Sequence, residues 1–429
     1  MTAETPRLPQ ELVDHIIDHL YDDPLTLSNC SLTSRAWLPT SRLHIFAKIG
    51  FKVSPLHTVP PNELCKRLYH LLTASPDIIP NIRELEICEG SPIGGTASPG
   101  CSTTWVATER TLPPLLKILT NLQRLEFGSR TTMHWGLLPL PLQNAIFYVF
   151  GLPSLAYIRL KSWSFPTFSD LTELLSFCQN LKGLALSDTR VCGDTDGDGD
   201  GDGEAEMDHS GRGLELETMD SDMEGTRRCR LDFLTIDHVD FGYLGYWLLS
   251  ARSTVEIKSL RELRVAHFYD VTAVERLLMA TGSSLEHFHL KPGPWDVHSF
   301  DLGRNSGLRT IRLTFEDPSR AITWVKTLLS TLSPSNLLEC IGIEFFTDIK
   351  KLEGWAELDA LLVRPELGAL RTVDIGLFAS PTNAEFARVR GELQGLGARG
   401  VLRLYQLGIK SQRSSGQLTP RISRYEYSS

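Results

Sequence analysis

The most regular feature of this chain is a short alternation of apolar and other residues that recurs along most of its length. In residues 82–87 it reads IRELEI, with apolar side chains at the first, fourth and sixth positions. The last three residues alternate, which predicts a β-strand because successive side chains of a strand point to opposite faces. Ten copies are present, and residues 400–407 are a candidate eleventh; the ten are centred on Leu85, Leu125, Ile158, Leu184, Leu234, Leu263, Phe288, Ile311, Ile341 and Val373.

The segments between these strands carry apolar residues at helical spacing. Residues 321–332, for example, place Ile322, Val325 and Leu329 on one face, and residues 271–280 follow the same pattern. Adjacent strand centres lie 23 to 50 residues apart, a spacing found in strand–helix repeats. The sequence therefore predicts an irregular leucine-rich-repeat solenoid, an α/β fold with a parallel sheet on the concave face and helices on the convex face.

An ordinary α/β sheet with crossover helices is the alternative. A dinucleotide-binding sheet has longer, continuously apolar strands and a glycine-rich phosphate loop, and neither occurs in this sequence. The repeats also depart from the usual leucine-rich pattern, because the asparagine three positions past the last leucine is missing and repeat lengths are uneven. The sequence therefore predicts a solenoid without predicting its curvature.

Composition is that of a soluble globular protein, with 41% apolar and 22% charged residues in 429. The most apolar stretch, residues 145–152, is eight residues long, whereas a membrane-spanning helix needs about 20. The N-terminus lacks an apolar signal core, and the eight cysteines include no C-x-x-C pair. We therefore expect no membrane contact and no disulfide scaffold, and a location in the cytoplasm, the nucleus or both.

The net charge of −9 comes from one segment. Residues 194–224 hold thirteen acids against one arginine, so the rest of the chain carries +3. This balance does not suit a nucleic-acid-binding protein. The Asp-Gly run in the segment resembles a calcium loop, but no register supplies the glutamate at the twelfth position. We expect residues 191–228 to be a disordered acidic insert, because they fall in the single gap of 50 residues between strand centres.

The first forty residues have a different pattern, that of a short amphipathic helix. Leu12, Ile16 and Leu20 form one i, i+4 row, and Val13 and Ile17 form a second row beside it. One interpretation is that one row packs inward and the other meets a partner. The alternative is an N-terminal cap in which both rows cover the first repeat.

This segment resembles the F-box, whose pattern is L-P-x-E-[LV]-x-x-x-I-[IL]-x-x-L followed by L-x-x-[CL]-x-x-V-[CS]-[RK]-x-[WF]. The chain departs from it at Thr33 and matches it at Leu8, Pro9, Glu11, Leu12, Ile16, Ile17, Leu20, Leu27, Cys30, Leu32, Ser34, Arg35 and Trp37. Together with the repeats, nearly the whole chain is similar to fungal F-box/leucine-rich-repeat proteins.

The resemblance implies a division of labour between the two parts of the chain. In that family the F-box docks into the Skp-type adaptor of a cullin–RING ubiquitin ligase, and the repeats hold a protein substrate. The candidate adaptor-binding residues carried over are Leu8, Pro9, Leu12, Ile16, Ile17, Leu20, Leu27, Cys30, Leu32 and Trp37. The sequence alone does not sort them into interface and internal core.

The predicted organisation follows from these segments. We expect an all-α F-box domain over residues 1–48, a connector or cap over 49–78, the repeat domain over 79–408, and a disordered tail over 409–429.

Each predicted strand exposes the residues just before and just after its central one. Ten strands about 4.8 Å apart would present two columns of side chains over roughly 43 Å, which suits a protein or peptide. Tyr and Arg are enriched at binding hot spots. The predicted substrate-binding residues are Tyr157, Arg159, Phe233, Arg264, His287, His289 and Arg312.

Catalytic chemistry has little support in the sequence. It contains no H-E-x-x-H, G-x-S-x-G or P-loop motif, so we expect neither an enzyme nor a cofactor. His287 and His289 share one strand face, while His267 in the neighbouring repeat lies past its strand. Since no Cys, Asp or Glu obviously completes a site, we interpret the pair as exposed residues and expect no metal. The leading hypothesis is a ligase adaptor, and the alternative is a non-degradative interaction scaffold.

Overall fold

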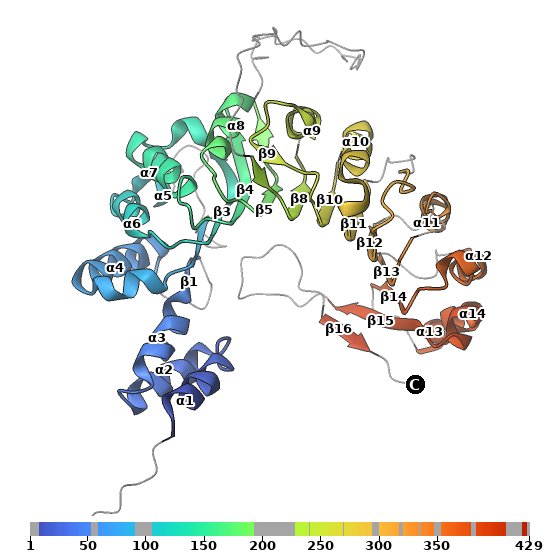
Figure 1. Cartoon of the computed structure of the whole chain (residues 1–429), viewed down its shortest axis with the longest axis horizontal. Coiled ribbons are helices and arrows are strands. Elements are labelled where there is room, and N and C mark those ends of the chain that lie inside the picture. The colour runs from blue at the N-terminus through green and yellow to red at the C-terminus, as the bar shows by residue number, and fades with distance from the viewer. Residues whose placement is uncertain are drawn as a thin grey trace, which may run out of the picture.

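The computed structural model describes residues 8–52, 59–90, 105–192, 228–239, 241–268, 270–293, 300–316, 321–333, 336–346, 353–378, 383–408 and 423–426. Within these ranges the chain is an α/β protein. Three N-terminal helices lead into one large sheet that curves into an arc, with the strands on its inner side and helices on its outer side (Figure 1).

Each of the ten predicted strands is present, and so is the candidate eleventh. The strands before the acidic segment are β1 (Lys48–Phe51), β2 (Glu84–Glu89), β3 (Arg124–His134), β4 (Tyr157–Phe165), β5 (Gly183–Ser187) and β6 (Arg190–Val191). Those after it are β7 (Cys229–Arg230), β8 (Phe233–Asp237), β9 (Val255–Glu256), β10 (Glu262–Ala266), β11 (His287–Lys291), β12 (Thr310–Phe315), β13 (Cys340–Phe345), β14 (Thr372–Leu377), β15 (Leu402–Gly408) and β16 (Ser423–Glu426).

The strands of the main sheet follow one another in chain order. From β1 to β15 every neighbouring pair is parallel, β6 pairs with β4, and β7 and β9 form a separate two-stranded sheet. A doubly wound nucleotide-binding sheet instead reverses its strand order at a switch point. The observed order therefore favours a solenoid-like arrangement over that alternative.

The outer layer consists of short helices that follow the strands. They are α4 (Pro61–Ala74), α5 (Trp105–Thr108), α6 (Leu112–Ile118), α7 (Leu140–Phe150), α8 (Phe168–Ser176), α9 (Phe241–Leu249), α10 (Val271–Thr281), α11 (Ala321–Ser330), α12 (Trp355–Leu362), α13 (Asn383–Glu392) and α14 (Gln394–Ala398). Short 3-10 helices lie at Pro76–Asn81, Trp135–Leu137, Gly282–Ser284 and Pro365–Leu367.

One continuous apolar core lies between the strands and these helices. In β10, for example, Leu263 and Val265 are buried, and they belong to the same cluster as Val274 and Leu277 of α10. The cluster extends from Phe51 in β1 to residues of β15. Because each strand–helix unit leaves an apolar side for the next one to cover, the units stabilise one another along the arc.

The predicted connector, acidic insert and tail each lie beside strands of the main sheet. Residues 49–78, predicted as a connector or cap, supply most of β1 and the whole of α4 at the N-terminal end of the sheet. The predicted acidic insert, residues 191–228, begins within β6 at Val191, and its residues 193–227 lie outside the described ranges; β5 and β8 on either side of it pair directly and in register. In the tail predicted to be disordered, Ser423–Glu426 instead forms β16, antiparallel to β15, and its other residues lie outside the described ranges.

Membrane-spanning helices and disulfides were both unexpected from the sequence. In the described ranges, no helix combines the length and apolar character needed to cross a membrane. None of the seven cysteines that the structure describes forms a disulfide.

Candidate interaction surfaces

The N-terminal head consists of α1 (Gln10–Asp18), α2 (Pro24–Thr33) and α3 (Leu38–Ala47). Asp23 caps α2 by accepting a hydrogen bond from the Thr26 amide, at 3.0 Å. The head has a small core of its own, separate from that of the sheet. It contains Val13, Ile17 and Leu27, with Leu20, Trp37 and Ile45 packed against them.

The two apolar rows of α1 have different environments. Val13 and Ile17 are 4% and 1% exposed, whereas Leu12 and Ile16 are 51% and 48% exposed. The buried row packs with Leu27 of α2 and Ile45 of α3 in the head core. The row of Leu12 and Ile16, which we call the exposed row, remains open on the surface of the described head.

The structure sorts the other candidate adaptor-binding residues in the same way. Leu8, Pro9 and Leu32 are exposed, as are Tyr21 and Leu25, which the sequence did not single out. Ile17, Leu27 and Cys30 are buried and are unavailable to a partner unless the head opens. Leu20 and Trp37 are partly buried against the head core.

The parallel register aligns the two predicted columns across the sheet. The column before the central residues runs through Glu84, Arg124, Tyr157, Gly183, Phe233, Glu262, His287, Thr310, Cys340 and Thr372. The column after them runs through Glu86, Glu126, Arg159, Ala185, Thr235, Arg264, His289, Arg312, Gly342 and Asp374. All seven predicted substrate-binding residues therefore lie on the same face of the sheet.

An aromatic pair occupies the middle of the first column. Tyr157 on β4 and Phe233 on β8 are separated by one strand, yet their ring centroids are 6.0 Å apart. The guanidinium carbon of Arg124 lies 3.9 Å from the centroid of the Tyr157 ring, and that of Arg264 lies 5.3 Å from the centroid of Phe233. Each ring is thus flanked by a cation on its outer side, at distances typical of cation–π contacts.

Positive charge gathers beside this pair in the second column. Arg264, His289 and Arg312 occupy the same register position on β10, β11 and β12. Arg264 is paired with Glu262 at 2.6 Å, while Arg159 and Arg312 form no ion pair with any residue that the structure describes. Burial, together with the charges of Arg264 and Arg312, lowers the pKa of His289 to about 3. Its imidazole is therefore neutral at physiological pH.

Two features of this face were not predicted. The carboxylates of Glu86 and Glu126 were placed in the exposed columns, but both residues are buried and form ion pairs with Lys52 at 2.5 Å and Arg124 at 2.6 Å. Arg124 was not predicted as a binding residue, because its place beside Tyr157 depends on the pairing of β3 with β4.

Comparison with known proteins adds no relative. No family model matches the chain, and no curated protein matches it. Its function is therefore inferred from its own residues and their arrangement.

Proposed function

We propose that this chain is a substrate-recognition adaptor of an SCF-type cullin–RING ubiquitin ligase. The head, which resembles an F-box, binds the Skp-type adaptor, and the strand face of the leucine-rich-repeat-like domain binds a protein substrate. The observation that carries the proposal is the exposed row of α1, where Leu12 and Ile16 face outward although the same helix buries Val13 and Ile17.

The energetics of the exposed row support a docking role. Completing the burial of two half-exposed aliphatic side chains stabilises a complex by about 1 kcal/mol each. Leu8 and Leu32 offer further exposed apolar area on the head. A three-helix head with its own core can keep this surface in place whether or not a substrate occupies the sheet.

The strand face supports the second half of the proposal. The aromatic pair and its flanking arginines combine the residue types that dominate protein-binding hot spots. They lie on neighbouring strands of a rigid sheet rather than on loops, so little ordering of side chains or backbone accompanies binding.

The test is co-purification of the chain with the Skp-type adaptor when the two are co-expressed. L12E/I16E should abolish co-purification, because an apolar groove does not accept carboxylates without a large desolvation cost. The matched control is L137E/L140E, which changes two leucines that are 78% and 66% exposed. Leu137 ends the 3-10 helix before α7 and Leu140 is the first residue of α7, both far from the head in sequence.

The outcomes separate the candidate functions. Loss of the adaptor in L12E/I16E but not in L137E/L140E, with unchanged circular dichroism in both, is the expected result. Undiminished co-purification of L12E/I16E contradicts the proposal. A wild-type chain that captures proteins through the sheet but never the adaptor would instead be an interaction scaffold.

A further inference from the structure

Three neighbouring strands end in residues with left-handed backbone conformation. Asp188, His238 and His267 directly follow β5, β8 and β10, with φ of 50°, 50° and 47°. Residues other than glycine adopt this conformation uncommonly, although Asp and His do so more often than most, and such backbone concentrates at functional sites. The shared conformation of His238 and His267 brings two imidazoles together at this edge of the sheet.

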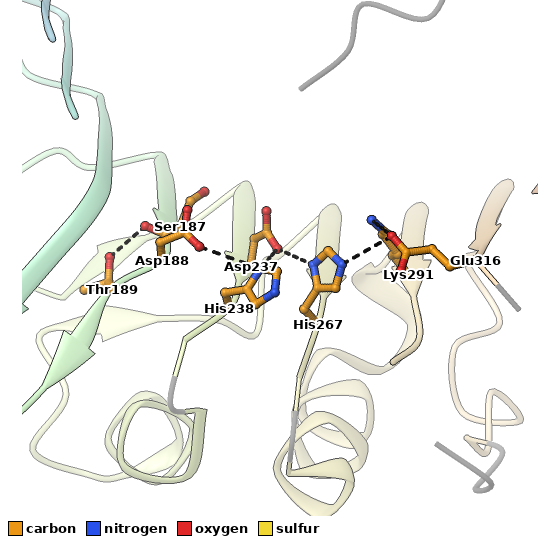
Figure 2. Close-up of polar contacts among 8 residues, drawn as sticks. All are labelled: Ser187, Asp188, Thr189, Asp237, His238, His267, Lys291 and Glu316. Atoms are coloured by element: carbon orange, nitrogen blue, oxygen red, sulfur yellow. Dashed lines mark hydrogen bonds and ion pairs between the residues drawn. The ribbon is translucent and has the colours of Figure 1, made fainter. Parts of the chain in front are cut away.

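The two imidazoles converge on one carboxylate, as Figure 2 shows. Asp237, the last residue of β8, accepts hydrogen bonds at Oδ1 from His267 Nδ1 at 2.8 Å and from His238 Nδ1 at 3.1 Å. The two rings are stacked with centroids 3.8 Å apart. Burial raises the pKa of Asp237, but the hydrogen bonds and charges of His267 and His238 outweigh it and hold that pKa below its ordinary value.

Further carboxylates flank this group on both sides (Figure 2). Asp188 Oδ1 lies 3.7 Å from His238 Nδ1, and Glu316 Oε1 lies 3.9 Å from His267 Nε2. Glu316 Oε1 also forms an ion pair with Lys291 Nζ at 2.7 Å. The row thus runs from the end of β5 to the residue after β12.

We propose that Asp237, His238 and His267 form a binding site for a divalent transition-metal ion such as Zn²⁺. Their donor atoms all lie within 4.8 Å of one another, and they are the group of three with this property among the described residues. Ligands about 2.1 Å from a metal are separated by roughly 3 to 3.5 Å, and Asp237 Oδ1 lies 2.8 and 3.1 Å from the two nitrogens.

The ion would replace the protons that the imidazoles now share with Asp237. Both Nδ1 atoms now point at Asp237 Oδ1, and a turn of one ring about its Cβ–Cγ bond would make room for the ion beside that oxygen. His238 is the ring that can turn, since it is exposed while His267 is partly buried. Asp188 is placed to become a fourth ligand once His238 has turned.

The donor set favours a transition metal over Ca²⁺ or Mg²⁺. Two imidazoles and one carboxylate suit Zn²⁺, Co²⁺, Ni²⁺ or Fe²⁺, whereas Ca²⁺ and Mg²⁺ prefer oxygen ligands alone. Metal-binding histidines commonly direct their second nitrogen toward a carboxylate, and His267 Nε2 faces Glu316 in this way. The other pair considered from the sequence, His287 and His289, belongs to no such group in the described residues.

The experiment is a calorimetric titration of the full chain with Zn²⁺ in excess Mg²⁺, which occupies sites made only of carboxylates, including those of the acidic segment. The test variant is H238N/H267N, because Asn tolerates left-handed backbone while its amide is a poor zinc ligand. The control is H15N/H19N, which removes a histidine pair with ring centroids 4.7 Å apart at the C-terminal end of α1, where His19 is the C-cap.

We expect one Zn²⁺ ion per chain in the wild type and the control, with at least tenfold weaker binding in H238N/H267N. The same ion should raise the melting temperature of the wild type but not that of H238N/H267N. Absence of Zn²⁺ binding in the wild type, equal affinity in H238N/H267N, or loss of binding only in H15N/H19N would each overturn the proposal. The inference does not depend on the proposed ligase function.

Discussion

Tyr157 and Phe233 meet across Gly183, with ring planes inclined by 32° and centroids 6.0 Å apart. The three residues share one register position on β4, β5 and β8. A Cβ atom at Gly183 would lie 2.5 Å from Tyr157 Cδ2 and 3.6 Å from Phe233 Cδ1. The absence of a side chain on β5 is therefore what allows the two rings to approach, and it leaves a preformed aromatic pair on the strand face.

G183A is expected to displace the Tyr157 ring and weaken substrate binding. Overpacking of this kind costs about 1 to 3 kcal/mol of unfolding free energy, measurable by urea denaturation. Because the clash is with the ring, Y157A should remove most of the cost in the double variant. The control is G391A in α13, where a Cβ meets nothing within 4 Å. Equal unfolding curves for G183A and the wild type would contradict this explanation.

R159E/R264E/R312E is expected to release substrates that the wild type captures. The three arginines lie on the strand face, and Arg159 and Arg312 have no acidic partner among the described residues that would neutralise them. The control R67E/R276E/R388E makes the same charge change on helices α4, α10 and α13. Substrates identified by mass spectrometry after pull-down should be lost only with the first variant. If R159E/R264E/R312E still captured these substrates, the binding site would lie elsewhere than on the strand face.

The strands and their register could be predicted because the signal for each is local. The alternation around Leu263 or Ile311 specifies which side chains face the core, and buried partners then fix the pairing. β1 was missed because residues 48–51 lack the leucine-rich pattern, although Phe51 joins the core. β16 was missed because its pairing with β15 depends on a distant partner rather than on its own sequence.

The sites were predicted less completely, because they depend on which neighbours pack where. In the sequence the Leu12 row and the Val13 row of α1 are equivalent, and only the packing of α2 and α3 buries one of them. The stack of His238 on His267 requires the residues after two neighbouring strands to adopt the same left-handed conformation. No pattern in the sequence predicts that conformation. Spacing along the chain instead directed attention to His287 and His289.

Deletion of residues 194–224 is expected to change the melting temperature by only a few degrees. β5 and β8, on either side of the segment, already pair in register from Gly183 to Ser187. Each halving of the length of a long connection changes the free energy of loop closure by only about 0.6 kcal/mol. Thermal unfolding followed by circular dichroism measures the effect. A fall of about ten degrees or more, large compared with that entropy change, would show that the segment stabilises the fold.

His289 is expected to make the folded protein less stable as the solution is acidified. Burial, followed by the charges of Arg264, Arg312 and His287, lowers its pKa to about 3, whereas a histidine in an unfolded chain titrates near pH 6.5. Between these values the unfolded chain binds a proton that the folded chain does not. This residue therefore lowers the unfolding free energy progressively as the pH falls through that window, and contributes nothing of this kind above it.

H289N should remove this contribution. Urea denaturation of the wild type and the variant at several pH values between about 7 and 4 compares the two slopes, and the wild type should lose more stability on acidification. The carboxylates of the protein titrate in both the wild type and the variant. The difference between the two slopes of unfolding free energy against pH therefore isolates His289. Glu262 Oε1 lies 3.7 Å from His289 Nε2, but the same oxygen is engaged by Arg264 at 2.6 Å. A variant whose stability falls as steeply as that of the wild type would mean that Glu262 compensates the partly buried imidazolium of His289.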